Sequence, residues 1–285
     1  MSGVPEYPKI DTLFDRDPVT HKVKETRIRR PEFEIPFTWT VTEKVDGTNV
    51  RVSLERECSV CSGPDPVSGD FFSCDTADAP HTGWRVVFYG RTAAAQMPTF
   101  LLEYLQRTFT LEKMTGLWQP KGRADCPSCL GEGHAIVQED PERPDILCRC
   151  FEPYPIILYG EGYGARIQKG GGNYRRDGDV SLRLFDVLIG RTWLSRANVI
   201  DVARQLEVKP VPSLVPEEVY GPLYTGVSVW ATQEVINIVR RGFTSTVADE
   251  EGSGMQAEGV VAFTDPPLFN GRGQRLMWKL KTKDF

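Results

Sequence analysis

A lysine placed directly before a glycine turn is the first feature of this sequence that could carry chemistry. Lys44 opens the segment Lys-Val-Asp-Gly-Thr-Asn, and apolar residues alternate with polar ones on both sides of it, over residues 39–54. This alternation predicts a hairpin, made of a strand, a tight glycine turn and a second strand. A lysine held at such a turn can act as a nucleophile if its pocket keeps the amine uncharged. An exposed lysine beside a hairpin turn is the alternative.

Two further lysines, Lys279 and Lys281, lie two residues apart near the end of the sequence. Because side chains alternate along a strand, both ammonium groups would project from one face, with Trp278 and Leu280 on the other. Two positive charges there could neutralise a phosphate group and favour the uncharged form of Lys44. A solvated basic strand is the ordinary alternative, but the apolar opposite face argues against it.

A carboxylate opens the apolar segment that precedes these lysines. Glu258 is followed directly by Gly-Val-Val-Ala-Phe, which reads as a strand. A carboxylate at the start of an apolar strand costs free energy unless it binds something. Glu258 is therefore a candidate binding residue.

The elements that must position these residues follow from hydrophobic periodicity and from breaker residues. A polar, mobile loop is predicted over residues 248–254, and a helix is predicted to begin at Pro98. Further helices are predicted near residues 195–206 and 230–240, and strands over residues 84–89, 156–159, 182–188, 258–263 and 275–281.

The composition is that of a water-soluble globular protein. The chain has 285 residues and a formal net charge of −5, which argues weakly against a nonspecific coat for nucleic acid but does not exclude a local basic groove. No apolar run approaches the ~20 residues of a membrane helix. Residues 1–17 lack a signal pattern, so we expect a cytoplasmic protein that does not bind membranes.

The chain divides into a leader and one domain. Residues 1–37 are rich in proline and charge, and we expect them to form an N-terminal leader packed on a domain of residues 38–285. Cysteine-rich insertions interrupt this domain at residues 57–82 and 124–151. A basic run in the leader favours a solvated segment over a substrate contact, and it consists of Lys22, Lys24, Arg27, Arg29 and Arg30.

The seven cysteines fall in two clusters, and an odd number in a cytoplasmic chain favours metal binding over disulfides. Their spacing is close to that of four-ligand structural zinc sites. One or two structural zinc ions are therefore predicted, with the alternative of one zinc shared between Cys58/Cys61 and Cys126/Cys129. The two predicted ligand sets are Cys58, Cys61, Cys74 and His81, and Cys126, Cys129, Cys148 and Cys150.

Five short segments occur in a recognisable order, beginning with Lys-x-Asp-Gly-Thr-Asn at Lys44. The others are Tyr-Gly-Glu at 159–161, Leu-Phe-Asp-Val at 184–187, Glu-Gly-Val-Val at 258–261 and Lys-Leu-Lys at 279–281. This order resembles the covalent nucleotidyltransferase superfamily of ATP-dependent ligases and mRNA-capping enzymes. It is most similar to the phage-type nick-sealing ATP-dependent RNA ligases. The resemblance spans residues 39–285 apart from the cysteine insertions.

The resemblance implies an α+β fold and a set of site residues. The fold would be an ATP-grasp-like ligase (nucleotidyltransferase) domain of two antiparallel sheets with flanking helices and zinc-binding loop insertions. Catalysis would use Lys44, Glu258, Lys279 and Lys281, with Glu258 holding the magnesium (or manganese) ion. ATP would contact Glu43, Asn49, Arg91, Glu161 and Phe185, and nucleic acid would contact Arg91 and Lys169.

Glu161 would accept a hydrogen bond from the ribose. Two other assignments have structural alternatives. Phe185 would stack on the adenine, although a core position explains it equally well. Lys169 could contact the RNA strand, although an ordinary turn lysine would occur in the same glycine-rich loop.

The function implied is ATP-dependent joining of RNA ends in RNA repair. Lys44 would form a lysyl-adenylate, the AMP would pass to a 5′-phosphate, and a 3′-hydroxyl would displace it. DNA-nick sealing and capping-type guanylyl transfer are alternatives, as is a catalytically inactive zinc-ribbon module that binds RNA. The partner would be RNA with 5′-phosphate and 3′-hydroxyl ends, DNA-containing nicks stay open, and no protein partner is implied. Because the sequence ends four residues after Lys281, we expect no C-terminal accessory domain.

Overall fold

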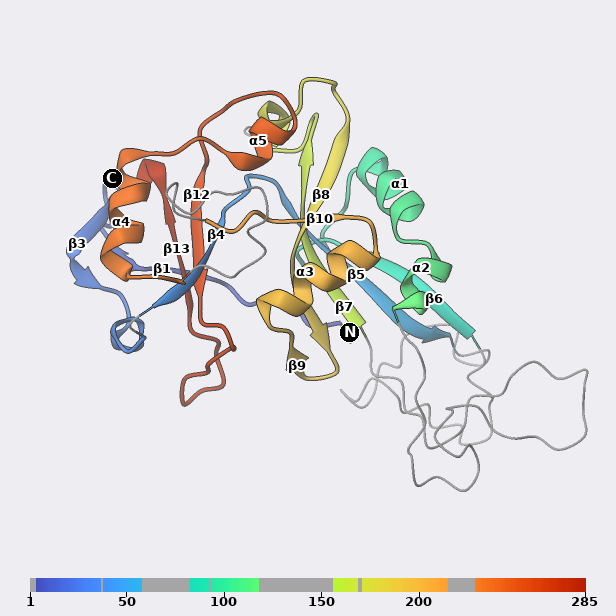
Figure 1. Cartoon of the computed structure of the whole chain (residues 1–285), viewed down its shortest axis with the longest axis horizontal. Coiled ribbons are helices and arrows are strands. Elements are labelled where there is room, and N and C mark those ends of the chain that lie inside the picture. Colours follow the sequence, from blue (N-terminus) through green and yellow to red (C-terminus); the bar gives the residue numbers. More distant parts are fainter. Residues whose placement is uncertain are drawn as a thin grey trace, which may run out of the picture.

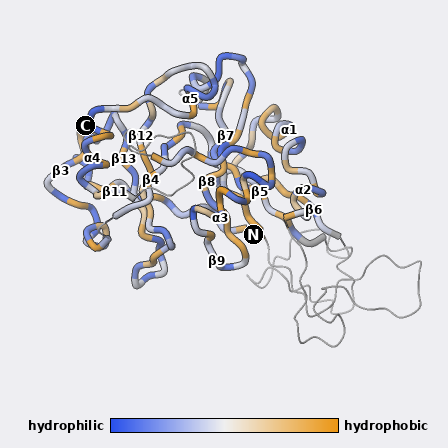
Figure 2. Tube along the Cα trace, in the orientation of Figure 1, coloured by the Kyte–Doolittle hydropathy of each residue, from blue (hydrophilic) through white to orange (hydrophobic). Residues whose placement is uncertain are grey.

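The chain has a mixed α+β fold built on two main sheets (Figure 1). The structure is a computed structural model and describes residues 4–36, 38–57, 83–92, 94–117, 156–168, 171–214 and 229–285. Apolar residues concentrate along the strands and on the inner sides of the helices (Figure 2). Each main sheet therefore has a hydrophobic core of its own.

The first main sheet has five strands and holds the two ends of the described chain together. Helix α4 (Thr232–Arg241) packs on it, and Trp39 and Trp278 meet edge to face in its core, with ring centroids 5.5 Å apart. Its order is β1 (Asp11–Thr12), β13 (Met277–Lys281), β12 (Gly259–Phe263), β4 (Trp39–Glu43) and β11 (Val229–Trp230).

The second main sheet has six strands, and three helices lie against it (Figure 1). Its order is β10 (Lys209–Pro210), β8 (Val180–Ile189), β7 (Ile156–Gly164), β5 (Thr48–Glu57) and β6 (Gly83–Tyr89), with β9 (Thr192–Trp193) paired to β8. The helices are α1 (Thr99–Thr108), α2 (Leu111–Gly116) and α3 (Arg196–Gln205).

Smaller elements complete the fold. The leader adds a two-stranded sheet, and α5 (Thr246–Glu250) lies beside η2. The elements not yet given are β2 (Phe14–Arg16), β3 (Val23–Ile28), and the short helices η1 (Pro31–Glu34), η2 (Gly171–Tyr174) and η4 (Thr282–Asp284).

The predicted helices at Pro98 and near residues 195–206 and 230–240 are confirmed as α1, α3 and α4. The predicted strands are also present, within a few residues at their ends. The expectation of two antiparallel sheets holds for most strand pairs. It is wrong at two edges, because β1 runs parallel to β13 and β10 runs parallel to β8.

Two local expectations are wrong. The turn after Lys44 is no hairpin, because β4 belongs to the five-stranded sheet and β5 to the six-stranded one. Residues 248–254 are no free polar loop either, since α5 occupies their first part. Glu250 and Glu251 lie 2.9 and 3.6 Å from the guanidinium of Arg183, which ties this segment to β8.

The cysteine insertions, with every predicted zinc ligand, lie outside the described residues. The division into a leader and one domain stays a prediction. None of the helices in the described ranges combines the length and apolar character needed to cross a membrane.

Gly47 lets the chain cross from one sheet to the other at close range. A Cβ atom at this position would lie 2.2 Å from the carbonyl oxygen of Gly162 and 3.0 Å from Cγ of Glu161. The first distance is far inside van der Waals contact with backbone, so any side chain would push β5 away from β7. A glycine is therefore required here by the close approach of two strands.

We predict that Gly47→Ala lowers the free energy of unfolding by about 1–3 kcal/mol, the usual cost of forcing extra volume into a packed region. Gly116→Ala is the matched control, because no atom lies within 4 Å of the Cβ position there and the residue is helical. Urea unfolding of both variants measures the difference. Equal stability of the two variants would contradict this interpretation.

Candidate active site

The charged side chains of Lys44, Glu258 and Lys281 meet where β4 ends, β12 begins and β13 ends. β4 pairs with β12 so that Glu43 lies opposite Val260, and the backbone amide of Lys44 donates to the carbonyl of Gly259 at 2.8 Å. β12 pairs with β13 so that Gly259 lies opposite Lys281. The sheet register therefore brings the side chains that flank these positions to one corner.

Glu258 forms ion pairs with two lysines in this corner. One carboxylate oxygen accepts from Lys44 Nζ and the other accepts from Lys281 Nζ. Burial alone would raise the pKa of Glu258, but the charge of Lys44 and the hydrogen bond from Lys281 outweigh it and lower this pKa. Glu258 is therefore ionised near neutral pH and holds both ammonium groups in place.

Lys279 lies on the same face of β13 but has a different environment. Burial lowers the pKa of Lys279, and the positive charge of Lys44 lowers it further. Such a lysine gains from a bound anion, because an anion would offset the positive charge of the neighbouring lysines.

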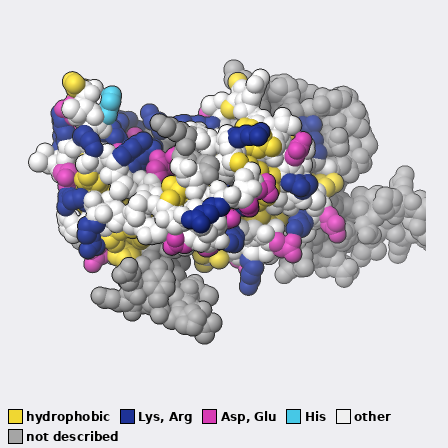
Figure 3. Space-filling model, turned by 90° about the horizontal axis from the view of Figure 1, so that it is seen from above, with side chains coloured by type: hydrophobic (Ala, Val, Ile, Leu, Met, Phe, Trp, Pro, Cys, Tyr) yellow, Lys and Arg dark blue, Asp and Glu magenta, His cyan; other side chains and the backbone are white. Residues whose placement is uncertain are grey.

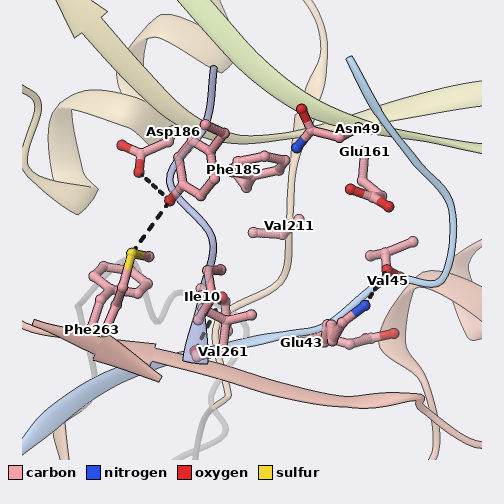
Figure 4. Close-up of a pocket in the computed structure, with 14 residues that line it drawn as sticks. Ile10, Glu43, Val45, Asn49, Glu161, Phe185, Asp186, Val211, Val261 and Phe263 are labelled. Atoms are coloured by element: carbon pink, nitrogen blue, oxygen red, sulfur yellow. Dashed lines mark hydrogen bonds between the residues drawn. The ribbon is translucent and has the colours of Figure 1, made fainter. Parts of the chain in front are cut away.

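A cavity of about 110 Å³ lies between the two main sheets and includes Lys44 in its wall. Asn49, Glu161 and Phe185 enter it from the six-stranded sheet and face Glu43 and Val261 of the five-stranded sheet (Figure 4). We call it the nucleotide cavity, after the ligand that the resemblance found in the sequence implies. Its other lining residues are Tyr7, Ile10, Thr42, Val45, Asp186, Val211, Phe263 and Met277.

The leader forms part of the wall of the nucleotide cavity. Tyr7 packs edge to face on Phe185, with ring centroids 4.9 Å apart, and its hydroxyl donates to Asp186 at 2.8 Å. Asp186 also pairs with Arg275, whose guanidinium lies 4.6 Å from the ring of Trp193. Phe185 is thus held at its outer edge by protein and stays half-buried at the cavity. It lines the cavity and also packs against two core clusters, so both predicted roles of Phe185, base stacking and core packing, stay open.

Glu43 has a structural task as well as a place in the cavity wall. Its carboxylate accepts hydrogen bonds from the Ser245 hydroxyl at 2.5 Å and from the amides of Thr246 at 2.9 Å and Val247 at 3.4 Å. Burial raises the pKa of Glu43, although these donors partly offset it. The residue before Lys44 therefore anchors the start of α5, which supports the position of the lysine.

Burial strongly affects the ionisation of Glu161 in this cavity. Burial raises its pKa to about 7, and the attraction of Lys44 only partly opposes this effect. Nearby, Asn49 carries a buried side-chain oxygen without a hydrogen-bond partner in the described part of the chain. A ligand that donates hydrogen bonds would satisfy this oxygen.

Tyr174 stabilises the turn that presents Lys44. The backbone amide of Asp46 donates to the Tyr174 hydroxyl at 3.0 Å, and the Tyr174 ring packs against Tyr163. Burial raises the pKa of Tyr174, which keeps the hydroxyl neutral. Asp46 and Gly47 therefore act through the geometry of the turn.

Not all predicted site residues come together. Arg91 is exposed beyond the end of β6 and does not line the nucleotide cavity, although its charge contributes to the environment of Lys279. Lys169 lies outside the described residues. The others, Lys44, Glu258, Lys279, Lys281, Glu43, Asn49, Glu161 and Phe185, lie in or next to the cavity.

Several supporting residues were not predicted from the sequence, namely Tyr7, Ile10, Ser245, Tyr174 and Arg275. Tyr7 and Ile10 belong to the single apolar segment of the leader, and this isolation was a signal that they pack on something. The other three lie in segments without a distinctive pattern, and their roles arise from contacts over long sequence distances.

The corner offers a divalent cation one protein carboxylate, that of Glu258. The described ranges contain no group of three or more His, Cys, Asp or Glu side chains that could hold a metal by themselves. Magnesium, however, commonly uses one or two carboxylates, with water and substrate phosphates completing its shell. Glu258 supplies one ionised carboxylate directly beside Lys44, which is sufficient for that mode of binding.

The arrangement can perform nucleophilic chemistry on a phosphate. It offers an amine beside a carboxylate, two further lysines on one strand, and a mostly apolar cavity that is lined by the Phe185 ring and by several polar groups. Positive charges placed around a reacting phosphate stabilise the charge that develops in phosphoryl transfer.

Residues 37–280 match the model of a protein family described as RNA ligase. No curated protein matches the sequence. Among solved structures, a lysine mutant of Naegleria gruberi RNA ligase with ATP and Mn is 14% identical with a TM-score of 0.48, and the match covers 98% of this chain and 58% of that one. The same protein with PPi is 15% identical with a TM-score of 0.46, covering 97% and 62%. This chain thus spans less than two thirds of the Naegleria protein in both structures.

We predict that Glu161 makes stability fall as pH rises. Its folded-state pKa of about 7 lies above the ordinary value of 4.5, so the folded protein resists ionisation of this group. Between pH 5 and pH 8, Glu161→Gln should therefore gain about 1–3 kcal/mol of unfolding free energy relative to wild type.

Urea unfolding at both pH values measures this difference. Glu103→Gln, which removes an exposed carboxylate on α1, is the matched control. A difference between Glu161→Gln and wild type that is the same at pH 5 and pH 8 would show that the cavity does not perturb Glu161.

Proposed function

The chain belongs to the RNA ligase family, a family of enzymes, and we propose that it is an ATP-dependent RNA ligase that joins a 5′-phosphate to a 3′-hydroxyl. The observation that carries this proposal is the corner where Lys44 and Lys281 share Glu258 at the edge of the nucleotide cavity. A lysine nucleophile, a phosphate-binding strand and a base-binding cavity are the three parts that the reaction needs.

The first step would form a bond between Lys44 Nζ and the α-phosphorus of ATP. The bond from that phosphorus to the bridging oxygen breaks, and pyrophosphate leaves. The Lys44 ammonium must give up one proton to water before Nζ can attack, so its ion pair with Glu258 has to break, and a second proton passes to water as the nitrogen–phosphorus bond forms. Lys281 and Lys279 stay on the face of β13 that would receive the phosphate charge. Phe185 would stack on the adenine and Glu161 would bind the ribose.

The second and third steps would reuse the same corner. An oxygen of the RNA 5′-phosphate attacks the phosphorus of lysyl-AMP and releases Lys44. The 3′-hydroxyl then attacks the 5′-phosphorus, and AMP leaves. Each step exchanges one bond to phosphorus for another, so positioning and charge neutralisation supply most of the rate.

Glu258 would hold the divalent cation, magnesium or manganese, when it is bound. The ion would supply charge neutralisation and orientation of the phosphates. The contribution of the chain is an ionised carboxylate, since the pKa of Glu258 is lowered by the adjacent lysines despite its burial.

We further propose structural zinc in the cysteine insertions, and a cytoplasmic location stays a prediction. The support for zinc is the sequence spacing, because the ligands lie outside the described residues. Elemental analysis of the purified protein should find one or two zinc ions per chain, and Cys126→Ser with Cys129→Ser should remove one. A protein that contains no zinc would contradict this proposal.

We predict that wild type incubated with α-labelled ATP and magnesium carries the label after denaturation. Lys44→Ala should lose at least ~100-fold of this labelling, because it removes the attacking atom. Lys113→Ala is the matched control, since Lys113 is a surface lysine on α2 that pairs with Glu207 outside the nucleotide cavity.

The rival functions give different outcomes in the same assay. Labelling with GTP and not ATP would favour a capping-type guanylyltransferase. Sealing of an all-DNA nick in preference to an RNA end would favour a DNA ligase. Absence of labelling with ATP, GTP or NAD, together with RNA binding that survives Lys44→Ala, would favour a module that binds RNA without catalysis.

A further inference from the structure

A second cavity, of about 420 Å³, lies beside the lysines of β13. We call it the leader cleft, because most of the residues that line it come from the first 30 residues of the chain. It is larger than the nucleotide cavity and shares one boundary residue, Ile10, with it. Its lining consists of Lys9, Ile10, Asp11, Thr12, Arg16, Arg29, Lys279, Lys281 and Lys283.

The parallel pairing of β1 with β13 creates this cleft. Thr12 lies opposite Lys279, and the amide of Leu13 donates to the Lys279 carbonyl at 3.2 Å. The chain then turns back through β2 and β3, which brings Arg16 and Arg29 to the same place. The leader is therefore built into the five-stranded sheet directly beside the lysines that would receive phosphate.

The cleft contains more positive than negative charge. Arg16 lies 2.8 Å from Asp284, Arg29 lies 3.5 Å from Asp11, and Lys281 pairs with Glu258. Within the ranges that the structure describes, the other three lining cations have no carboxylate within ion-pair distance. These are Lys9, Lys279 and Lys283.

The cations are also accessible. Lys9 and Lys283 are exposed, and the side chain of Arg29 is 40% exposed. Lys and Arg side chains gather at the end of the molecule that holds β3 and β13 (Figure 3). Unpaired, exposed cations in a groove are typical of sites that follow a nucleic-acid backbone.

Lys281 connects the leader cleft to the reacting corner. It lines the cleft, and its ammonium shares Glu258 with Lys44, which lines the nucleotide cavity. An incoming phosphate must approach the phosphorus of lysyl-AMP opposite the bond to Lys44, because attacking and leaving groups lie in line. The departing pyrophosphate leaves along that same direction in the first step.

We infer that the leader cleft binds the phosphodiester backbone of the RNA strand that supplies the 5′-phosphate. This inference rests on the proposed ligase function and names the segment that grips the substrate. Lys9, Arg29 and Lys283 hold backbone phosphates, and Lys279 and Lys281 receive the terminal one. The lowered pKa of Lys279, caused by burial and by neighbouring positive charge, agrees with a site that awaits an anion.

The test is a triple variant, Lys9→Gln with Arg29→Gln and Lys283→Gln. A matched triple, Lys113→Gln with Arg204→Gln and Lys209→Gln, removes the same charge from surface positions that do not line the cleft. Fluorescence anisotropy of a 5′-phosphorylated single-stranded RNA, titrated at several salt concentrations, measures binding. Lysyl-AMP formation with labelled ATP, and its reversal by inorganic pyrophosphate, are measured in parallel.

The leader triple should weaken RNA binding at least ~10-fold and reduce the salt dependence of log K by about 2, since each phosphate contact to a single strand contributes ~0.7. The fold decrease in lysyl-AMP formation should be at least ~10-fold smaller than the fold decrease in RNA affinity. Equal weakening by both triples would overturn the inference, because net charge would then explain it.

Two further results separate the possible failures. Slower lysyl-AMP formation and weaker pyrophosphate reversal, with RNA binding unchanged, would assign the cleft to pyrophosphate and overturn the inference. A wild-type protein that forms no lysyl-AMP would contradict the proposed function, whereas the comparison of RNA binding between the two triples would still decide what the cleft binds.

Discussion

The shared carboxylate of Glu258 is the interaction on which the rest of the site depends. It lies between two ammonium groups, where β4 and β13 end and β12 begins, and its side chain is only 12% exposed. Removing either partner of a partly buried ion pair leaves an uncompensated charge, which usually costs more than the pair itself contributes. The lysine that would attack ATP is therefore stored in a defined position, and its release requires a compensating charge.

The two sheets and the leader each contribute residues to the candidate site. The six-stranded sheet supplies Phe185, Asn49 and Glu161 to the nucleotide cavity, while the five-stranded sheet supplies the charged corner. Tyr7 and Ile10 link these parts, because both line the nucleotide cavity and Ile10 also lines the leader cleft. The N-terminal segment is thus part of the cavity wall, and the pairing of β1 with the strand that carries Lys279 and Lys281 holds it there.

Local spacing predicted Lys44, Glu258 and Lys281 as candidates, because each stands at the end or on one face of a segment with clear periodicity, and the structure brings the three side chains together. Which strands pair with each other could not be predicted from the sequence in the same way. Alternation predicts a strand but not its partner, so the Gly47 turn was expected to be a hairpin although it joins two sheets. The leader was expected to pack on the domain, but alternation could not show where, because the parallel pairing of β1 with β13 joins positions more than 260 residues apart.

The most direct test is to locate the covalent AMP. The protein is incubated with ATP and magnesium and digested at a pH that preserves the phosphorus–nitrogen bond, and the peptides are mapped by mass spectrometry. AMP attached to Lys44, and to no other lysine, is the expected result. Attachment to Lys279 or Lys281, or a protein that seals RNA without any AMP on Lys44, would contradict the assignment of the nucleophile.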